Sequence, residues 1–164
     1  MKKVIVLGVI FFMNTFFINC QTFYSNQNNN KKIEFKVKKS EKEWKDELTP
    51  KEFNILRNKG TERPYTGVYN MHFKKGTYEC KGCGQALFKS DNKFVSDCGW
   101  PSYESAIPGA IIYKEDKSLG MVRTEIICSN CGGHQGHVFD DGPTETGKRY
   151  CVNSASINFI NNKK

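Results

Sequence analysis

The sequence predicts a mainly β, β-rich α+β domain, antiparallel in its pairing, with one helix near its start and a span of about residues 45–160. Glycine and proline recur every few residues after residue 60, the apolar runs between them are short, and no later stretch keeps a 3.6-residue period. The runs typical of short strands are residues 76–80, 85–90, 93–97, 110–116, 121–128, 137–141 and 150–160.

The helix is expected over residues 48–60, "LTPKEFNILRNKG". Thr49 can cap its N-terminus, Pro50 suits the first helical position, and Glu52 can complete a capping box. Gly60 is the expected stop at the C-terminus, where a left-handed residue often ends a helix.

The first 19 residues combine a short basic start with an apolar run, which is typical of a signal peptide rather than of a membrane span. Cys20 follows directly, so the segment resembles a bacterial lipoprotein signal, in which that cysteine carries the lipid. We expect an exported protein anchored to a membrane through Cys20. An uncleaved anchor or a plain signal peptide are the alternatives.

Residues 20–45 are expected to form a linker, because the run is polar, asparagine-rich and lysine-rich, with little to bury. The formal net charge of the chain is +8. Most of the excess positive charge of the mature part lies in this linker, whereas basic and acidic residues nearly balance in residues 46–164. The expected domain therefore has no charge pattern for binding nucleic acid.

Four cysteines form two C-x-x-C units, Cys80/Cys83 and Cys128/Cys131, each followed by a glycine. Such a unit points both sulfurs at one spot, and two units together make a tetrahedral four-sulfur site suited to zinc or an iron–sulfur centre. Four thiolates leave zinc no open position, so the predicted zinc site is structural. Disulfides are the alternative in an exported chain.

Cys98 and Cys151 belong to neither unit. They could form a structural disulfide, fill the core, or act as nucleophile and resolving thiol. In a strand, residues 149, 151 and 153 share one face, so Arg149 and Asn153 would lie beside Cys151 as a cation and an amide donor. Such groups activate a thiol, which favours a thiol-redox enzyme without naming its substrate.

His134 and His137 follow the second C-x-x-C unit closely. Since the two units already supply four ligands, both histidines are free for other roles. Four phenylalanines are expected in the core: Phe73, Phe88, Phe94 and Phe139.

Residues 48–157 resemble the methionine sulfoxide reductase B family. The matching motifs stand in order as "YECKGCGQALF", "CGWPSY", "TEIICSNCGGHQGHVFDDGP" and "TGKRYCVNSAS". The resemblance implies two small antiparallel sheets with a structural zinc. It also implies reduction of the R epimer of methionine sulfoxide in oxidised proteins, and a thioredoxin-like reductant.

The resemblance also implies roles for single residues. Cys151 takes the position of the catalytic cysteine, and Cys98 that of the resolving cysteine, which implies an intramolecular disulfide. Trp100 matches the residue that packs against the methyl group of the substrate. The matching polar residues of the active site are His134, His137, Arg149, Asn153 and Asp141.

Two further expectations follow. Asp97 stands where glycine is common, and its charge could raise the pKa of the neighbouring Cys98 thiol. The rival class is a zinc-stabilised binding module without catalytic activity, in which Cys98 and Cys151 would be dispensable.

Overall fold

The structure, a computed structural model, describes residues 33–162. The expected signal peptide, Cys20 and the first part of the expected linker lie outside these residues. Within residues 33–162, no helix is long and apolar enough to cross a membrane.

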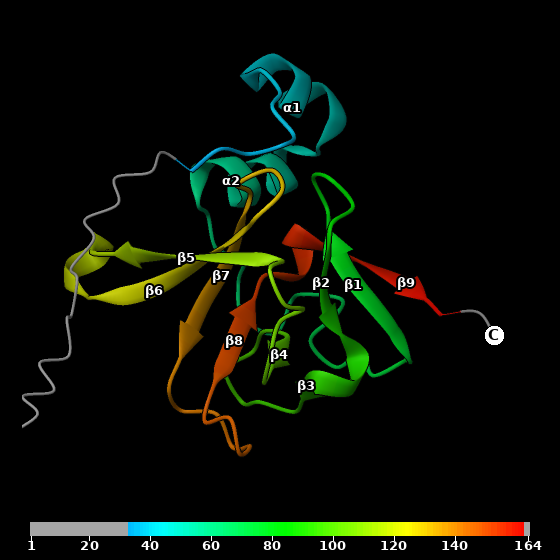
Figure 1. The fold of residues 1–164 in the computed structure, drawn as a ribbon, viewed down its shortest axis with the longest axis vertical. Coiled ribbons are helices and arrows are strands. Elements are labelled where there is room, and N and C mark those ends of the chain that lie inside the picture. Colours follow the sequence, from blue (N-terminus) through cyan, green and yellow to red (C-terminus); the bar gives the residue numbers. More distant parts are fainter. Residues whose placement is uncertain (1–32, 163–164) are drawn as a thin grey trace, which may run out of the picture. The chain divides into compact units, whose positions relative to one another are not determined.

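The chain forms two antiparallel sheets and two helices (Figure 1). The three-stranded sheet has the order β2-β1-β9, and the six-stranded sheet has the order β3-β4-β8-β7-β6-β5. The strands are β1 (Gly76–Cys80), β2 (Ala86–Lys89), β3 (Lys93–Phe94), β4 (Ser102–Tyr103), β5 (Ile111–Asp116), β6 (Arg123–Cys128), β7 (His134–Phe139), β8 (Arg149–Val152) and β9 (Ile157–Asn161). The predicted fold class is confirmed, and the expected strand regions each contain a strand.

Helix α2 (Pro50–Asn58) begins as the sequence predicts. Thr49 is the N-cap, and it forms a complete capping box with Glu52. The left-handed residue at the other end is Lys59, with φ of 57°, and not Gly60. Gly60 is needed for space instead, because a Cβ there would lie 2.4 Å from the side chain of Asn54.

Helix α1 (Glu41–Glu47) begins inside the segment expected to be a linker, residues 20–45, and ends two residues beyond it. Ser40 and Glu43 cap its N-terminus in a second capping box, and Trp44 is buried, with only 3% of its surface exposed. Four lysines of this region pair with acids, which offsets part of the positive charge: Lys38 with Glu34, Lys39 with Glu47, Lys42 with Asp46 and Lys45 with Glu41. The folded region therefore begins before residue 46. Trp44 supplies apolar surface for packing, which the lysine-rich composition of residues 20–45 does not indicate.

The two sheets pack through aromatic side chains. Tyr103 of β4 stacks on Phe88 of β2, with ring centroids 4.4 Å apart, and meets Tyr78 of β1 edge-on at 5.3 Å. All three rings are fully buried. Of the phenylalanines expected in the core, Phe88 is buried, but Phe73 is 44% exposed, so that expectation is wrong for Phe73.

Short 3₁₀ turns connect some of the strands: η1 (Ser90–Asn92), η2 (Ser118–Gly120) and η3 (Ser154–Ser156). The turn η3 interrupts the predicted run 150–160 and separates it into β8 and β9, which belong to different sheets. Residue 153, at the end of β8, is thus placed where the chain leaves the large sheet.

Candidate active site and metal centre

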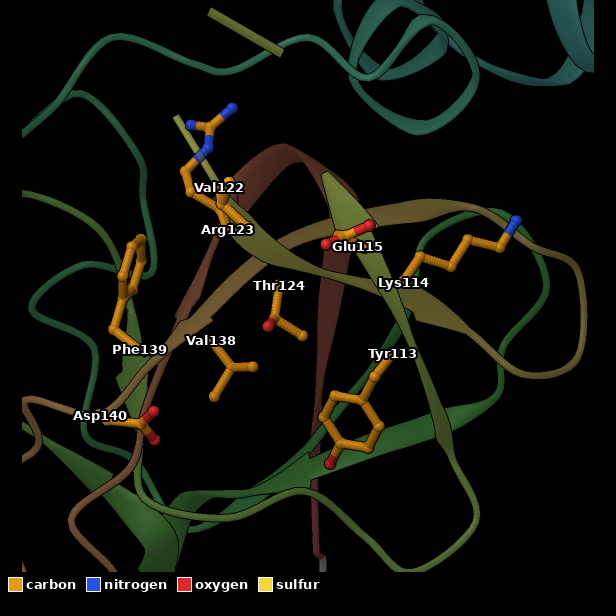
Figure 2. A pocket seen from close by; sticks show the side chains of 9 residues that line it. All are labelled: Tyr113, Lys114, Glu115, Val122, Arg123, Thr124, Val138, Phe139 and Asp140. Carbon is orange, nitrogen blue, oxygen red and sulfur yellow. The ribbon is translucent and has the colours of Figure 1, made fainter. Parts of the chain in front are cut away.

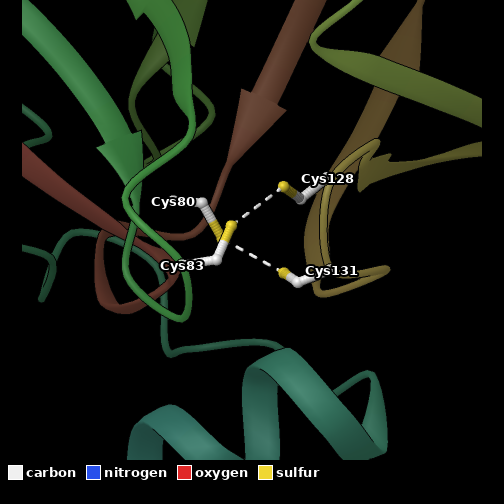
Figure 3. Close-up of side chains that lie close together, drawn as sticks. All are labelled: Cys80, Cys83, Cys128 and Cys131. Atoms are coloured by element: carbon white, nitrogen blue, oxygen red, sulfur yellow. Dashed lines mark hydrogen bonds between the residues drawn. The ribbon is translucent and has the colours of Figure 1, made fainter. Parts of the chain in front are cut away.

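The four cysteines of the C-x-x-C units converge between the two sheets (Figure 3). Cys80 ends β1, Cys128 ends β6, and Cys83 and Cys131 lie in the turns that follow these strands. The four sulfurs lie within 4.8 Å of one another, with Cys80–Cys131 at 3.7 Å and Cys83–Cys128 at 3.6 Å. Tetrahedral coordination with metal–sulfur bonds of about 2.3 Å places sulfurs about 3.8 Å apart, so the cluster fits a metal ion.

The surroundings of the cluster also fit a metal thiolate site. The side-chain amides of Asn130 and Gln135 donate to the sulfurs of Cys83 and Cys80 at 3.4 and 3.5 Å, which offsets negative charge. No disulfide joins the six cysteines of the described region. The residues after each unit, Gly84 and Gly132, have φ of 70° and 72°, a left-handed turn that favours glycine.

The register of the six-stranded sheet aligns two candidate residues, His137 and Cys151, in one row with two further polar residues. Glu125 on β6 lies opposite His137 on β7. His137 lies opposite Cys151 on β8, and Cys151 lies opposite Ser102 on β4. Side chains directly opposite in antiparallel strands share a face, so this row forms one polar line on the sheet.

A β-bulge adds His134 to this face. The register shifts between Ile126 and Ile127, which leaves Gln135 without a partner on β6. Residues three apart in a regular strand point to opposite faces, but the extra residue restores His134 to the face of His137. The two imidazole rings lie with their centroids 5.5 Å apart.

A cavity of about 150 Å³ opens beside Cys151. Trp100 forms one wall, and its indole Nε1 donates to the backbone oxygen of Glu62 at 3.1 Å. The other residues that line the cavity are Thr61, Arg123, Gly136, His137, Phe139, Val152 and Asn153. Of the residues predicted from the sequence, the cavity thus brings together Cys151, Trp100, His137 and Asn153.

Cys98 lies beside Cys151, with their sulfurs 3.7 Å apart. The hydrogen bond from Cys151 lowers the pKa of Cys98 to about 4, against the effect of burial and with help from the hydroxyl of Ser102. The same bond raises the pKa of Cys151, and the nearby Arg149 opposes this rise. The pKa of Cys98 is thus lowered, so the expectation that it is raised is wrong.

The two histidines have different partners. Nε2 of His137 donates to Asp116 at 2.7 Å, and Asp116 also accepts from Arg123. Burial lowers the pKa of His137, the bond to Asp116 raises it, and the charges of Arg123 and His134 lower it, with a net lowering.

His134 does not line the cavity and is only 2% exposed, and its Nδ1 donates to the buried Glu125 at 2.8 Å. Lys59 donates to the other carboxylate oxygen of Glu125 at 2.7 Å. Burial would raise the pKa of Glu125, but these two bonds hold it at about 2. Nε2 of His134 is buried without a hydrogen-bond partner in the part of the chain described.

Arg149 and Asp141 form a two-bonded ion pair, with Nε–Oδ1 at 2.8 Å and Nη2–Oδ2 at 2.7 Å. The guanidinium also lies over the ring of Phe139, 4.6 Å from its centroid. Asp141 is exposed and does not line the cavity. Its connection to the site is through Arg149, which lies close enough to Cys151 to lower its pKa.

Glu62 is a residue that the sequence reasoning missed. Its backbone N–H donates to the side chain of Asn153 at 3.0 Å, and its backbone oxygen accepts from Trp100. Its buried carboxylate accepts from the backbone N–H groups of Ser154 and Ala155, at the start of η3. Glu62 thereby holds two walls of the cavity, although its sequence context, "TERPYTG", is only a loop pattern.

The missed polar residues of the site also include Glu125, Asp116 and Arg123. The sequence contains a signal for Glu125, because an acidic residue inside the apolar strand run "TEIIC" indicates a buried carboxylate with a partner. Asp116 and Arg123 pair across β5 and β6, which no local pattern indicates.

Comparisons with known proteins show the family of the chain. Residues 48–161 match the SelR domain family. The peptide methionine sulfoxide reductase MsrB of Agrobacterium fabrum is 55% identical over 125 residues, covering 76% of this chain and 93% of that protein. The protein of the same name from Leptospira interrogans is 52% identical over 128 residues, covering 77% and 98%. That from Methanosarcina barkeri is 55% identical over 124 residues, covering 75% and 87%. The chain belongs to the peptide methionine sulfoxide reductase MsrB family.

Proposed function

We propose that this chain reduces methionine-R-sulfoxide in oxidised proteins to methionine, with Cys151 as nucleophile and Cys98 as resolving cysteine. The observation that carries the proposal is the pair of sulfurs 3.7 Å apart at a cavity walled by Trp100 and His137. Family membership supports the reaction, and the geometry supports these roles.

The reaction begins when Cys151 attacks the sulfoxide sulfur. Its proton passes to the thiolate of Cys98 along the hydrogen bond between the two sulfurs. The sulfoxide oxygen moves to Sγ of Cys151, which becomes a sulfenic acid, and methionine leaves. Cys98 then attacks that sulfur, a disulfide forms, and the oxygen departs as water with the proton of Cys98. A thioredoxin-like dithiol donates two electrons and two protons to restore both thiols.

His137 is the residue we assign as proton donor to the sulfoxide oxygen. It lines the cavity and lies opposite Cys151, whereas His134 does not line the cavity and is bonded to Glu125. Protonating the oxygen makes the sulfur more electrophilic, which is the contribution of a general acid. Asn153 also lines the cavity, although its amide is already engaged with Glu62 and Gln135, so it orients more than it donates.

Selectivity for the R epimer follows from the two walls. The indole of Trp100 offers an apolar face to the methyl group, and His137 offers a donor to the oxygen. The S epimer would exchange these two groups and leave the oxygen on the apolar wall.

Zinc is the metal we assign to the four-cysteine cluster, with a structural role only. Support comes from the four sulfur donors and their near-tetrahedral separations. Four thiolate ligands leave the metal no open position for substrate, and the proposed reaction includes no step at the metal.

We also propose that the domain works in the cell envelope, anchored through Cys20. The support is the order of basic start, apolar run and cysteine in residues 1–20. Intact mass of the membrane fraction should show a lipid-modified chain that begins at Cys20. An unmodified chain that retains residues 1–19 would contradict the proposal.

The test of the reaction supplies each sulfoxide epimer of a blocked methionine with dithiothreitol. Only the R epimer should be consumed, and Cys151→Ser should lower kcat by about a thousandfold or more, because the nucleophile is lost. Equal consumption of both epimers, or activity that survives Cys151→Ser, would contradict the proposal, and consumption of neither epimer would favour the binding-module class.

A second variant, Cys98→Ser, tests the resolving role of Cys98. Cys98→Ser should abolish turnover with thioredoxin yet leave one stoichiometric turnover, because Cys151 still reaches the sulfenic acid. Multiple thioredoxin-driven turnovers would show that Cys98 is not required.

A further inference from the structure

The chain on both sides of Cys98 is held by a single residue of another loop, Tyr65. Cys98 lies in the loop between β3 and β4, and Tyr65 lies in the loop between α2 and β1. The hydroxyl of Tyr65 donates to the backbone oxygen of Asp97. The backbone N–H of Tyr65 donates to the backbone oxygen of Gly99 at 2.7 Å. Tyr65 thus bonds to the residue before Cys98 and to the residue after it.

The two loops are also in close contact. A Cβ at Gly99 would lie 2.7 Å from the Cβ of Pro64 and 2.9 Å from the backbone nitrogen of Tyr65. Gly99 also has φ of 89°, so position 99 favours glycine for its conformation as well as for space. Glu62, from the same loop as Tyr65, accepts from the indole of Trp100. Residues 62–65 therefore hold residues 97–100 through three hydrogen bonds.

Core packing does not explain the place of Tyr65. The residue is 67% exposed. Its φ of 64° lies in the left-handed region, which a bulky residue rarely adopts. Such a conformation persists where surrounding contacts hold it, and these positions cluster at functional sites. The exposed ring of Tyr65 therefore serves the contact with the Cys98 loop rather than the core.

The resolving step needs Cys98 close to Cys151. Their sulfurs are 3.7 Å apart and must meet at bonding distance when Cys98 attacks the sulfenic acid. Cys151 lies in β8, which is paired on both sides by β4 and β7, whereas Cys98 lies outside any strand. A reaction within one chain is faster when the reacting groups are held together in the right geometry. The loop of Cys98 thus gains most from an additional support.

We propose that Tyr65 is a positioning residue for the resolving step, because it holds the loop of Cys98 within reach of the sulfenic acid on Cys151. The inference rests on the proposed function, since it concerns the second step of that reaction. In this step the sulfur–sulfur bond forms, the sulfur–oxygen bond breaks, and the oxygen leaves as water. Tyr65 acts through the backbone of Asp97 and Gly99 and is not itself a reactant. Fast resolution also protects Cys151 from further oxidation to the sulfinic acid.

A competition for the sulfenic acid tests this inference. The protein receives an equimolar amount of blocked methionine-R-sulfoxide, with no reductant and with dimedone, which traps sulfenic acids. Mass spectrometry then gives the ratio of dimedone adduct on Cys151 to disulfide. Tyr65→Phe removes only the hydroxyl, so this ratio should rise by about fivefold, the factor expected for the loss of one hydrogen bond. An unchanged ratio would overturn the inference.

The matched control is Tyr113→Phe, which also removes the hydroxyl of an exposed tyrosine. Tyr113 is 52% exposed, and its hydroxyl bonds to that of Tyr150 at 2.7 Å. Tyr113 pairs with Ile126, so it lies on the face of the sheet opposite to His137 and Cys151. There it lines a separate cavity of about 420 Å³ on strands β5, β6 and β7 (Figure 2). Tyr113→Phe should therefore keep the ratio of the unaltered protein.

A second control uses Cys98→Ser, in which Tyr65 has no resolving thiol to hold. Adding Tyr65→Phe to this variant should leave the rate of dimedone capture unchanged. A faster capture would show that Tyr65 shields Cys151 from the reagent, which would overturn the inference. So would slower turnover with thioredoxin at an unchanged ratio, since Tyr65 would then contact the reductant. If the unaltered protein left the R epimer unreduced, the proposed function would be refuted instead.

Discussion

At the scale of the residue, the environment of His137 decides how the reaction depends on pH. Burial lowers its pKa below the ordinary value of about 6.5, while Asp116 raises it in part. As proton donor, His137 acts in its protonated form, so kcat/KM should fall as pH rises through a midpoint below about 6.5. Asp116→Asn removes the raising effect, so this midpoint should move to still lower pH and the rate at neutral pH should drop.

The pH profile of the blocked amino acid checks this prediction. Asp46→Asn is the matched control, because it also removes a carboxylate charge, but from an exposed ion pair on α1. Its profile should coincide with that of the unaltered protein. An unmoved midpoint in Asp116→Asn would show that another group supplies the proton.

The sequence predicts some of these residues and not others, for a physical reason. Arg149 and Cys151 alternate along β8 and Asn153 follows the strand directly, so all three lie in one short segment that a local pattern can predict. Asp116 and Glu125 act across strands, and their contacts depend on a register that the local pattern does not contain.

At the scale of the element, the turn η3 is anchored by Glu62. Glu62→Gln replaces one carboxylate oxygen by an amide nitrogen, which cannot accept from a backbone N–H of Ser154 or Ala155. A buried donor left unsatisfied costs about 1–3 kcal/mol, so the midpoint of thermal unfolding should fall by several degrees. KM for the sulfoxide should rise, because Trp100 and Asn153 are held by the backbone of the same residue.

Circular dichroism and steady-state kinetics together check this prediction. Glu145→Gln, in an exposed turn, is the control and should change neither quantity. If Glu62→Gln lowered the unfolding midpoint without raising KM, Glu62 would be structural and not a positioning residue. An unchanged midpoint would contradict the anchoring role itself.

The sequence predicts the start of helix α2, but it does not predict helix α1 or the β-bulge at Gln135. The sequence of helix α2 contains all the N-terminal capping signals, so the first residue of the helix is predicted correctly. Helix α1 has an equally good capping box, but only one of its residues, Trp44, is buried, so the lysine-rich composition dominates the pattern. The bulge at Gln135 is invisible to a period of two, yet it is what turns His134 toward His137.

At the scale of the whole molecule, the four-cysteine cluster joins the two sheets. Cys80 comes from the three-stranded sheet and Cys128 from the six-stranded sheet, and helix α2 is tied to the same place by Arg57, which donates to the backbone oxygen of Cys131 at 3.2 Å. The spacing of the C-x-x-C units predicts the ligands. Only the topology reveals that they connect separate sheets.

Removal of the metal should therefore unfold the domain rather than merely loosen one turn. Structural zinc contributes about 10–16 kcal/mol in small domains, as much as the whole free energy of unfolding of about 5–15 kcal/mol. Cys128→Ser should abolish zinc binding and cooperative thermal unfolding. Metal analysis measures the bound zinc, and circular dichroism measures the unfolding transition. Cys98→Ser removes a thiol outside the cluster and should keep one zinc per chain with a cooperative transition. If metal-free protein melted at the temperature of the zinc-bound form, the aromatic contacts of Tyr78, Phe88 and Tyr103 alone would hold the sheets together.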